Sequence, residues 1–483
     1  MVSGNKVEPF KKALVYSSIV ICVLVFAAYL TIIGHSYFFQ DDFYFWPRYS
    51  TLEFHHLFNP KGNFGRPVTR DLYFFLTSHI LGKDPANFFY LNLAVIAGVC
   101  WFIYRTLREF SIDPYVAATA AAVYFYMAPT VPHALWISNS QHTVAHLFSF
   151  WFIALMIGGI NAGKPRLVSA AIVFLLAVFS NVSSLFAVVF VGVYVLLRNH
   201  RTAIPQFGRL IVFLGALTSV TVAWSLAISH NAPVVYKLDL SLEHSLIGAQ
   251  FYDELLRAGM IGRGYWLLFI AVIALVALNI RRTYLLTLPL LAAFGTAFGM
   301  LFFLSDQRTL GYMAIPYILF ALMLFGNFAM PAFRAREIRS FALIGLSFVF
   351  VFYSIENGAP QRESFMDSPY GSGIRELQTA VKNVPITKDT AFCFAPSIPS
   401  PEEANTSPFW LVLGVGRAFW LIDYGDQYKR QFLFYKDAKC SMPDAVHVTV
   451  SKRNATLAVT SIQGPESAGF PARQLQGALE HSR

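Results

Sequence analysis

Long apolar segments recur along the chain, and they constrain its fold more than any other feature. The first, LVYSSIVICVLVFAAYLTII at residues 14–33, contains no charged residue. A helix of about 20 apolar residues crosses the roughly 30 Å of hydrocarbon in a bilayer. The segments predict about eleven transmembrane helices, at 13–34, 86–107, 113–130, 141–160, 166–180, 182–197, 209–228, 264–280, 283–303, 310–328 and 338–355. We therefore predict an all-α polytopic membrane protein.

The composition agrees with this interpretation. Of the 483 residues, 56% are hydrophobic and only 13% are charged, and the mean hydropathy is +0.51. The first apolar segment lacks a small-residue cleavage site behind a short apolar core. It is therefore predicted to be a retained helix and not a cleaved signal peptide.

The distribution of Lys and Arg predicts the orientation of these helices. If the N-terminus is cytoplasmic, one set of short connections carries far more basic than acidic residues, as the positive-inside rule requires. The long segments 35–85, 229–262 and 356–483 then lie outside, in the periplasm if the membrane is a bacterial inner (plasma) membrane. The net charge of +10 follows mostly from this topology, so no nucleic-acid partner is predicted.

The chain divides into three predicted regions. Residues 1–355 form the transmembrane domain, residues 356–461 a small soluble periplasmic α/β domain, and residues 462–483 a disordered tail. Within the second region, 374–384 has helical spacing, 390–396 and 445–450 resemble strands, and 409–425 is a buried helix or a surface that leans on the bilayer. Cys393 and Cys440 both fall there, and an exported domain permits a disulfide between them. Cys22 and Cys100 are interpreted as packing residues.

Five short motifs follow one another along the transmembrane region. They are QDDFYFW with Asp41 and Asp42, GRPVTRD with Arg66 and Arg70, GKDP at 82–85, PHALWISNSQHT at 132–143, and SDQRTLGYMAIP at 305–316. In this order they resemble the GT-C superfamily of integral-membrane glycosyltransferases, in particular its protein O-mannosyltransferase-like branch. The chain departs from the pattern at Ser180-Asn181-Val182, where many relatives have Ser-Lys-Glu, and at Pro132-His133, where the family order is His-Pro.

The resemblance implies a GT-C-like helix arrangement with periplasmic amphipathic helices, and a transfer reaction at the outer face. A sugar would move from a polyprenyl-phosphate carrier to a hydroxyl or amine of a cell-envelope glycan, lipopolysaccharide or protein. No metal and no cofactor is implied, because the lipid-linked sugar is a co-substrate. Polyprenyl phosphate leaves readily, so the reaction needs a base for the acceptor proton and cations for the phosphate.

The acidic pair supplies the predicted base. Adjacent helical residues point about 100° apart, so one carboxylate can face the acceptor while a partner holds the other. We predict Asp41 as the base, matching the first acid of the family motif, and Asp42 as its orienting neighbour. The alternative is that the pair only caps an amphipathic helix beginning here.

Arg308, Arg66 and Arg263, with Tyr312, are predicted to bind the donor phosphate. Arg308 lies at the outer end of an apolar segment, where a lipid phosphate would balance its charge. Alternatively, it pairs with Asp306, and Arg66 is an interfacial anchor whose charge reaches the headgroups.

The second outer loop supplies further predicted substrate contacts. His133, Trp136, Asn139 and His142, together with Arg70, provide donors and a stacking face, although Trp and His also belong to ordinary interfacial belts. His142 and His146 have the spacing of a metal pair but lack a third ligand. Residues 229–262 are predicted to form a surface amphipathic helix with Asp253, Glu254 and Arg257 on its polar side.

Two other classes of function stay open at this point. One is a polytopic transporter or lipid flippase, which would favour internal repeats and charges within the spans. The other is a different outer-face transferase, such as an O-antigen ligase or an acyltransferase. The sequence contains no nucleotide-binding loop or nucleophile elbow. The sugar, the acceptor and the oligomeric state also stay open.

Overall fold

The chain forms a bundle of apolar helices. The computed structural model describes residues 7–35, 42, 66–82, 84–231, 241, 246, 283–299 and 310–329, and five short strands between 392 and 474. Five helical segments are long and apolar enough to cross a membrane: Val15–Gly34, Pro85–Glu109, Ile137–Asn161, Val182–Arg201 and Phe207–Ile228. Leu167–Ser180, Thr283–Gly299 and Gly311–Asn327 are shorter apolar helices. The protein is therefore a polytopic membrane protein, as predicted.

Nine of the predicted spans coincide with helices. These helices are α1 (Val7–His35), α4 (Pro85–Glu109), α5 (Pro114–Tyr126), α7 (Ser140–Asn161), α8 (Leu167–Ser180), α9 (Leu185–Arg201), α10 (Phe207–Asn231), Thr283–Gly299 and α13 (Ala314–Ala329). Helix α5 stops short of the predicted end at 130, because Pro129 lacks the N–H that a continuing helix needs. The predicted spans 264–280 and 338–355 lie outside the described residues.

Local sequence explains where two of these helices begin. The carboxylates of Asp84 and Asp113 accept hydrogen bonds from the backbone N–H two residues later, at 2.9 Å and 3.0 Å. Each aspartate precedes a proline at the first helical position, Pro85 or Pro114. An aspartate cap followed by proline suits a helix N-terminus, so the Asp84-Pro85 part of the GKDP motif begins α4.

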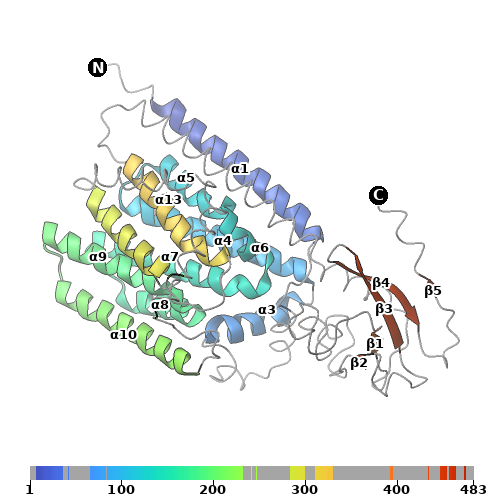
Figure 1. Ribbon diagram of the computed structural model, residues 1–483. Helices are drawn as coiled ribbons and strands as arrows, with labels where there is room; N and C mark the ends of the chain where they lie inside the picture. Colours follow the sequence, from blue (N-terminus) through green and yellow to red (C-terminus); the bar gives the residue numbers. More distant parts are fainter. Residues whose placement is uncertain are drawn as a thin grey trace.

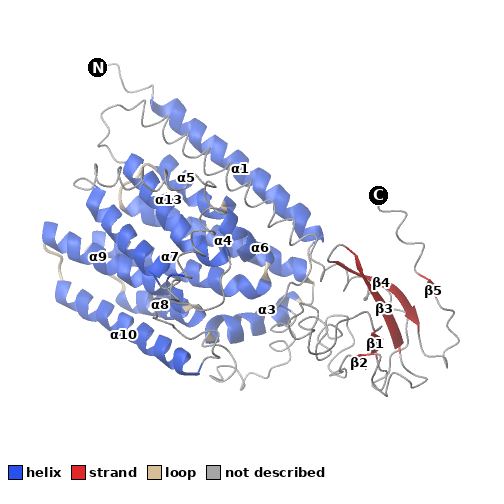
Figure 2. Ribbon diagram, viewed as in Figure 1, coloured by secondary structure: helices blue, strands red, loops and turns tan. Residues whose placement is uncertain are grey.

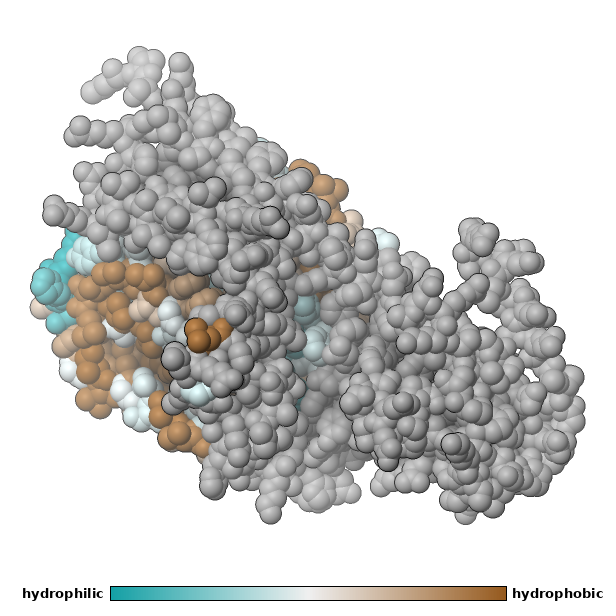
Figure 3. Space-filling view, in the orientation of Figure 1, coloured by the Kyte–Doolittle hydropathy of each residue, from teal (hydrophilic) through white to brown (hydrophobic). Residues whose placement is uncertain are grey.

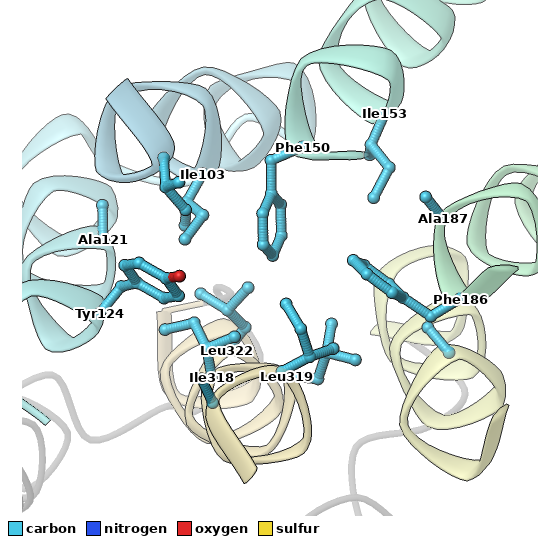
Figure 4. Close-up of a cluster of buried hydrophobic side chains, with 14 of the residues drawn as sticks. Ile103, Ala121, Tyr124, Phe150, Ile153, Phe186, Ala187, Ile318, Leu319 and Leu322 are labelled. Atoms are coloured by element: carbon cyan, nitrogen blue, oxygen red, sulfur yellow. The ribbon is translucent and has the colours of Figure 1, made fainter. Parts of the chain in front are cut away.

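The helices form a bundle in which α4 and α7 contact several neighbouring helices (Figure 1). Helix α4 contacts α5 and α7, α7 contacts α8 and α9, and α1 lies along α5 at the edge of the bundle. Ile103, Tyr124, Phe150, Phe186 and Leu319 are among the side chains that fill the interior (Figure 4). Apolar side chains also cover the outside where α9 and α10 lie (Figure 3), as a lipid-facing surface requires.

Polar contacts gather at the two ends of the bundle. At one end, Asn161 donates to the Glu109 carbonyl oxygen at 3.0 Å and accepts from the Tyr194 hydroxyl at 2.6 Å. These contacts join the ends of α4, α7 and α9, which the charge pattern predicts for one side of the membrane. At the other end, described residues from outer segments of the predicted topology meet, among them Asp42, Arg70 and Gln141, and the candidate site lies there. The side of the membrane on which each end lies stays a prediction.

The strands lie in the C-terminal part of the chain (Figure 2). They are β1 (Phe392–Phe394), β2 (Leu433–Phe434), β3 (Val446–Arg453), β4 (Thr456–Gln463) and β5 (Arg473–Gln474), in the sheet order β2-β1-β3-β4-β5. Strand β1 is parallel to β2 and β3, and β3 and β4 form an antiparallel pair. The strand predicted at 390–396 contains β1, and the strand predicted at 445–450 covers the first part of β3, which continues to Arg453. The domain boundaries stay a prediction. The disordered tail predicted at 462–483 also stays a prediction, and β5 lies within it. The predicted helix at 374–384, the segment 409–425 and Cys440 lie outside the described residues.

Candidate functional site

The segment from Ile137 to His142 organises the polar end of the bundle. It comprises the 3-10 helix η4 (Ile137–Asn139) and the first turn of α7. The Asp42 carboxylate, which is 1% exposed, accepts hydrogen bonds from the backbone N–H of Ser138 at 2.6 Å and of Ile137 at 3.3 Å. Asp42 therefore caps η4, a helix 95 residues further along the chain. The helix that the sequence alternative assumed lies outside the described residues.

Two guanidinium groups converge on the same segment. Arg66 precedes the π-helix η2 (Pro67–Tyr73), which continues into α3 (Phe74–Leu81). The side-chain oxygen of Gln141 accepts two hydrogen bonds. One comes from a guanidinium N–H of Arg66, and the other comes from Arg70 Nε, which lies 2.9 Å from this oxygen. Because both reach the same oxygen, Arg66 and Arg70 lie on one face, as residues four positions apart on a helix do. The shared amide oxygen of Gln141 orients Arg66 and Arg70, called here the arginine pair.

A further hydrogen bond fixes η2 against α8. The Thr69 hydroxyl donates to the Ser180 carbonyl oxygen at 3.1 Å, and both residues are fully buried. The arginine pair is therefore held by a helix that is anchored on both sides. Half-buried Arg66 lies against Gln141 and does not reach outward as a headgroup anchor would.

His133 joins the second outer loop to the start of α13. It lies in α6 (Val131–Leu135) and contacts the carbonyl oxygen of Gly311, in the 3-10 helix η7 (Leu310–Met313), through Nε2 at 2.9 Å. Its Nδ1 lies 3.1 Å from the Asn139 side-chain nitrogen. A carbonyl accepts and an amide NH₂ donates, so the proton of this neutral ring is on Nε2. Because protein groups use both ring nitrogens, the contacts favour a structural role for His133.

The burial of His133 implies a pH-dependent stability. Burial lowers the pKa of His133 to about 4, although the hydrogen bonds with Gly311 and Asn139 oppose the shift. Below about pH 6.5 the histidine is protonated in the unfolded chain but stays neutral in the folded protein. The free energy of unfolding therefore falls as the pH drops from about 6.5 to 4. We expect His133→Gln to remove on the order of 3 kcal/mol of this acid sensitivity. Thermal unfolding of the wild type and His133→Gln in detergent at pH 7 and pH 4.5 measures this difference. An equal loss of stability between the two pH values in both proteins would contradict the role given to His133.

Two more buried histidines lie beside His133. The ring centroids of His133, His142 and His146, called here the histidine cluster, are 5.2–6.4 Å apart. His146 contacts the Tyr124 hydroxyl through Nδ1 at 2.6 Å, and the His142 ring meets the Tyr312 ring edge-on at 4.6 Å. In the described part of the chain, no group of three or more His, Cys, Asp or Glu side chains is arranged to hold a metal ion.

The structure brings together most of the described residues that the sequence singled out. Asp42, Arg66, Arg70, His133, Trp136, Asn139, His142 and Tyr312 all belong to this end of the bundle, through the contacts above or their place in the second outer loop. Asp41, Arg263, Arg308, Asp306 and the polar side of the 229–262 helix lie outside the described residues. Their roles stay predictions.

Sequence reasoning placed Gln141 only among the polar residues of the second outer loop, as a possible substrate contact, and gave no role to Asn181. Both residues lie at the centre of this network. Gln141 orients the arginine pair, and the Asn181 side chain contacts His142 Nδ1 at 3.1 Å. The only sequence signals were the crowding of polar residues in the second outer loop and the polar break between two apolar segments. Neither signal names the partner.

Comparisons of the chain with known protein families, curated proteins and solved structures found no match.

Proposed function

We propose that the protein is a GT-C-type glycosyltransferase that moves a sugar from a polyprenyl-phosphate carrier to an acceptor hydroxyl or amine on the outer face of the membrane. One observation carries the proposal. A single short segment, Ile137–His142, holds the Asp42 carboxylate at one end and the arginine pair at the other. A carboxylate and guanidinium groups at the end of a lipid-embedded bundle suit a reaction between a water-borne acceptor and a lipid phosphate.

The proposed chemistry uses these groups in separate roles. The acceptor oxygen or nitrogen forms a bond to the anomeric carbon of the sugar while the bond from that carbon to the phosphate oxygen breaks. The acceptor proton passes to Asp41, the proposed general base. Asp42, whose carboxylate is bonded to two backbone N–H groups, orients its neighbour. The polyprenyl phosphate leaves as an anion.

Cations stabilise that leaving group. Guanidinium groups bind phosphate with two parallel hydrogen bonds, and Gln141 already orients Arg66 and Arg70. Arg308, Arg263 and Tyr312 are proposed as further phosphate contacts. The proposed arrangement has about eleven transmembrane helices, a cytoplasmic N-terminus and an outer C-terminal domain, and the acceptor is a cell-envelope glycan, lipopolysaccharide or protein.

A transfer assay tests the proposed function. Membranes containing the wild-type chain are incubated with a radiolabelled polyprenyl-phosphate sugar and an envelope extract, and labelled product is measured. We expect transfer by the wild type and a loss of at least 100-fold in Asp41→Asn, because a general base contributes roughly 10²–10⁴-fold. Wild-type transfer by Asp41→Asn would remove Asp41 from the role of base. Disappearance of the lipid from one leaflet without product would instead support a flippase.

A further inference from the structure

Asn181 lies at the break between α8 and the 3-10 helix η5 (Val182–Ser184), and both ends of its amide are engaged. Its Oδ1 accepts the backbone N–H of Ser183 at 3.0 Å, and its Nδ2 lies 3.1 Å from His142 Nδ1. A backbone N–H only donates, so the amide oxygen must face Ser183. The NH₂ group must then face His142. The local fold of η5 thus decides which way the amide points.

This orientation determines the protonation pattern of His142. The NH₂ group of Asn181 donates, so His142 Nδ1 accepts and carries no proton. A neutral imidazole holds one proton, which is therefore on Nε2. Among the described residues, the ring makes its hydrogen bond through Nδ1, and the side chain is only 3% exposed. His142 therefore presents a buried N–H donor at Nε2.

The surroundings of His142 suit a neutral donor at an anion site. Its neighbour in sequence, Gln141, binds both guanidinium groups of the arginine pair. A second proton on the ring would add positive charge close to these cations. Among the described residues, the titratable and charged groups around the ring include Arg66 before η2, Arg70 in η2, His133 in α6, His146 in α7 and Tyr312 in η7.

We propose that Asn181 is a positioning residue that holds His142 in the Nε2–H tautomer, so that the ring donates a hydrogen bond to an anionic oxygen bound by the arginine pair. The inference rests on the proposed function, in which that oxygen belongs to the phosphate of the lipid-linked donor. Asn181 acts through His142 and does not itself touch the ligand. A histidine ring can carry its proton on either nitrogen, and the role of Asn181 is to keep it on Nε2, so that Nε2 is the donor.

The tautomer is measured directly by nitrogen NMR. The full chain is labelled with ¹⁵N-histidine in lipid nanodiscs, and the signals of His142 are those missing from His142→Gln. We expect an unprotonated Nδ1 and a protonated Nε2 in the wild type. Asn181→Asp keeps the acceptor for the Ser183 N–H but presents an acceptor to the ring, so Nδ1 should become protonated. A protonated Nδ1 in the wild type, or an unchanged ring in Asn181→Asp, would overturn the proposal.

Asn199→Asp is the matched control for this substitution. Asn199 also accepts a backbone N–H through its side-chain oxygen, from Ile204 at 3.0 Å, in the connection after α9. The same change of amide to carboxylate there should leave the His142 signals unchanged. A shift of those signals in Asn199→Asp would mean that they respond to general charge and would overturn the assignment to a direct contact.

Binding of farnesyl phosphate separates this inference from the proposed function. We expect the ligand to shift the His142 Nε2 signal and to bind Asn181→Asp about tenfold more weakly. In a His142→Phe background, Asn181→Asp should change binding little, because the two residues act together. Equal binding to wild type and Asn181→Asp would refute the donor role. If the wild type does not bind farnesyl phosphate but the tautomer is as expected, the proposed function fails and the positioning role stands.

Discussion

Asp42→Ala is expected to lose transfer activity by at least 100-fold and to lower the free energy of unfolding by about 2–6 kcal/mol. The carboxylate is buried and accepts two backbone N–H groups of η4. Alanine leaves both donors buried without this acceptor, and each costs about 1–3 kcal/mol. The loosened η4 would also release the neighbouring Asp41 from its proposed position. Radiolabelled sugar transfer and thermal unfolding in detergent measure the two effects.

The controls separate the charge of Asp42 from its capping role. Asp42→Asn retains one acceptor oxygen, so it should lose about half of the stability that Asp42→Ala loses. Asp84→Asn changes another aspartate that caps a helix N-terminus, but Asp84 is exposed and accepts the Ala86 N–H of α4. It should cost only a few tenths of a kcal/mol and leave transfer unchanged. If Asp42→Ala retained the stability and the transfer activity of the wild type, the contact between Asp42 and η4 would contribute to neither.

Gln141 variants are expected to produce the second large effect, on donor binding. Gln141→Leu removes the acceptor shared by Arg66 and Arg70, so the KM for the lipid-linked sugar should rise about 10–100-fold and the protein should be less stable. Gln141→Glu keeps the acceptor but adds a negative charge that pairs with both guanidinium groups. It should raise the unfolding temperature and still weaken donor binding, because the carboxylate competes with phosphate.

The opposite stability effects of the two Gln141 variants make this test specific. A purely structural glutamine would lose donor binding only when stability falls. Thr69→Val is the matched control on the same helix, because it removes the hydrogen bond to Ser180 without touching the arginine pair. We expect lower stability and an unchanged KM for Thr69→Val. An unchanged KM in Gln141→Glu would exclude the arginine pair as the phosphate site.

The network around Ile137–His142 places opposite charges on one rigid support. Asp42 binds its first two residues, the arginine pair binds Gln141, and Asn181 binds His142. Each contact comes from a different part of the chain, so the site exists only when these elements are packed together. Substitutions in Ile137–His142 are therefore expected to affect the contacts of Asp42, of the arginine pair and of His142 together.

The sequence by itself determined the features that depend on local chemistry. Apolar segments of spanning length became helices, because only a helix satisfies its own backbone hydrogen bonds in a bilayer. Asp84-Pro85 and Asp113-Pro114 begin α4 and α5, because an aspartate cap followed by proline suits a helix N-terminus. Arg66 and Arg70 lie four positions apart, and positions four apart are neighbours on a helix.

Only the tertiary structure decided which polar groups meet. Gln141 binds Arg70 across 71 residues, Asn181 binds His142 across 39, and Asp42 binds Ser138 across 96. Hydropathy locates a helix in the membrane but leaves its rotation and its neighbours undetermined, because lipid is as apolar as the helix surface. Packing of α4, α7, α8 and α13 sets those rotations, and with them the acceptor of the arginine pair and the tautomer of His142.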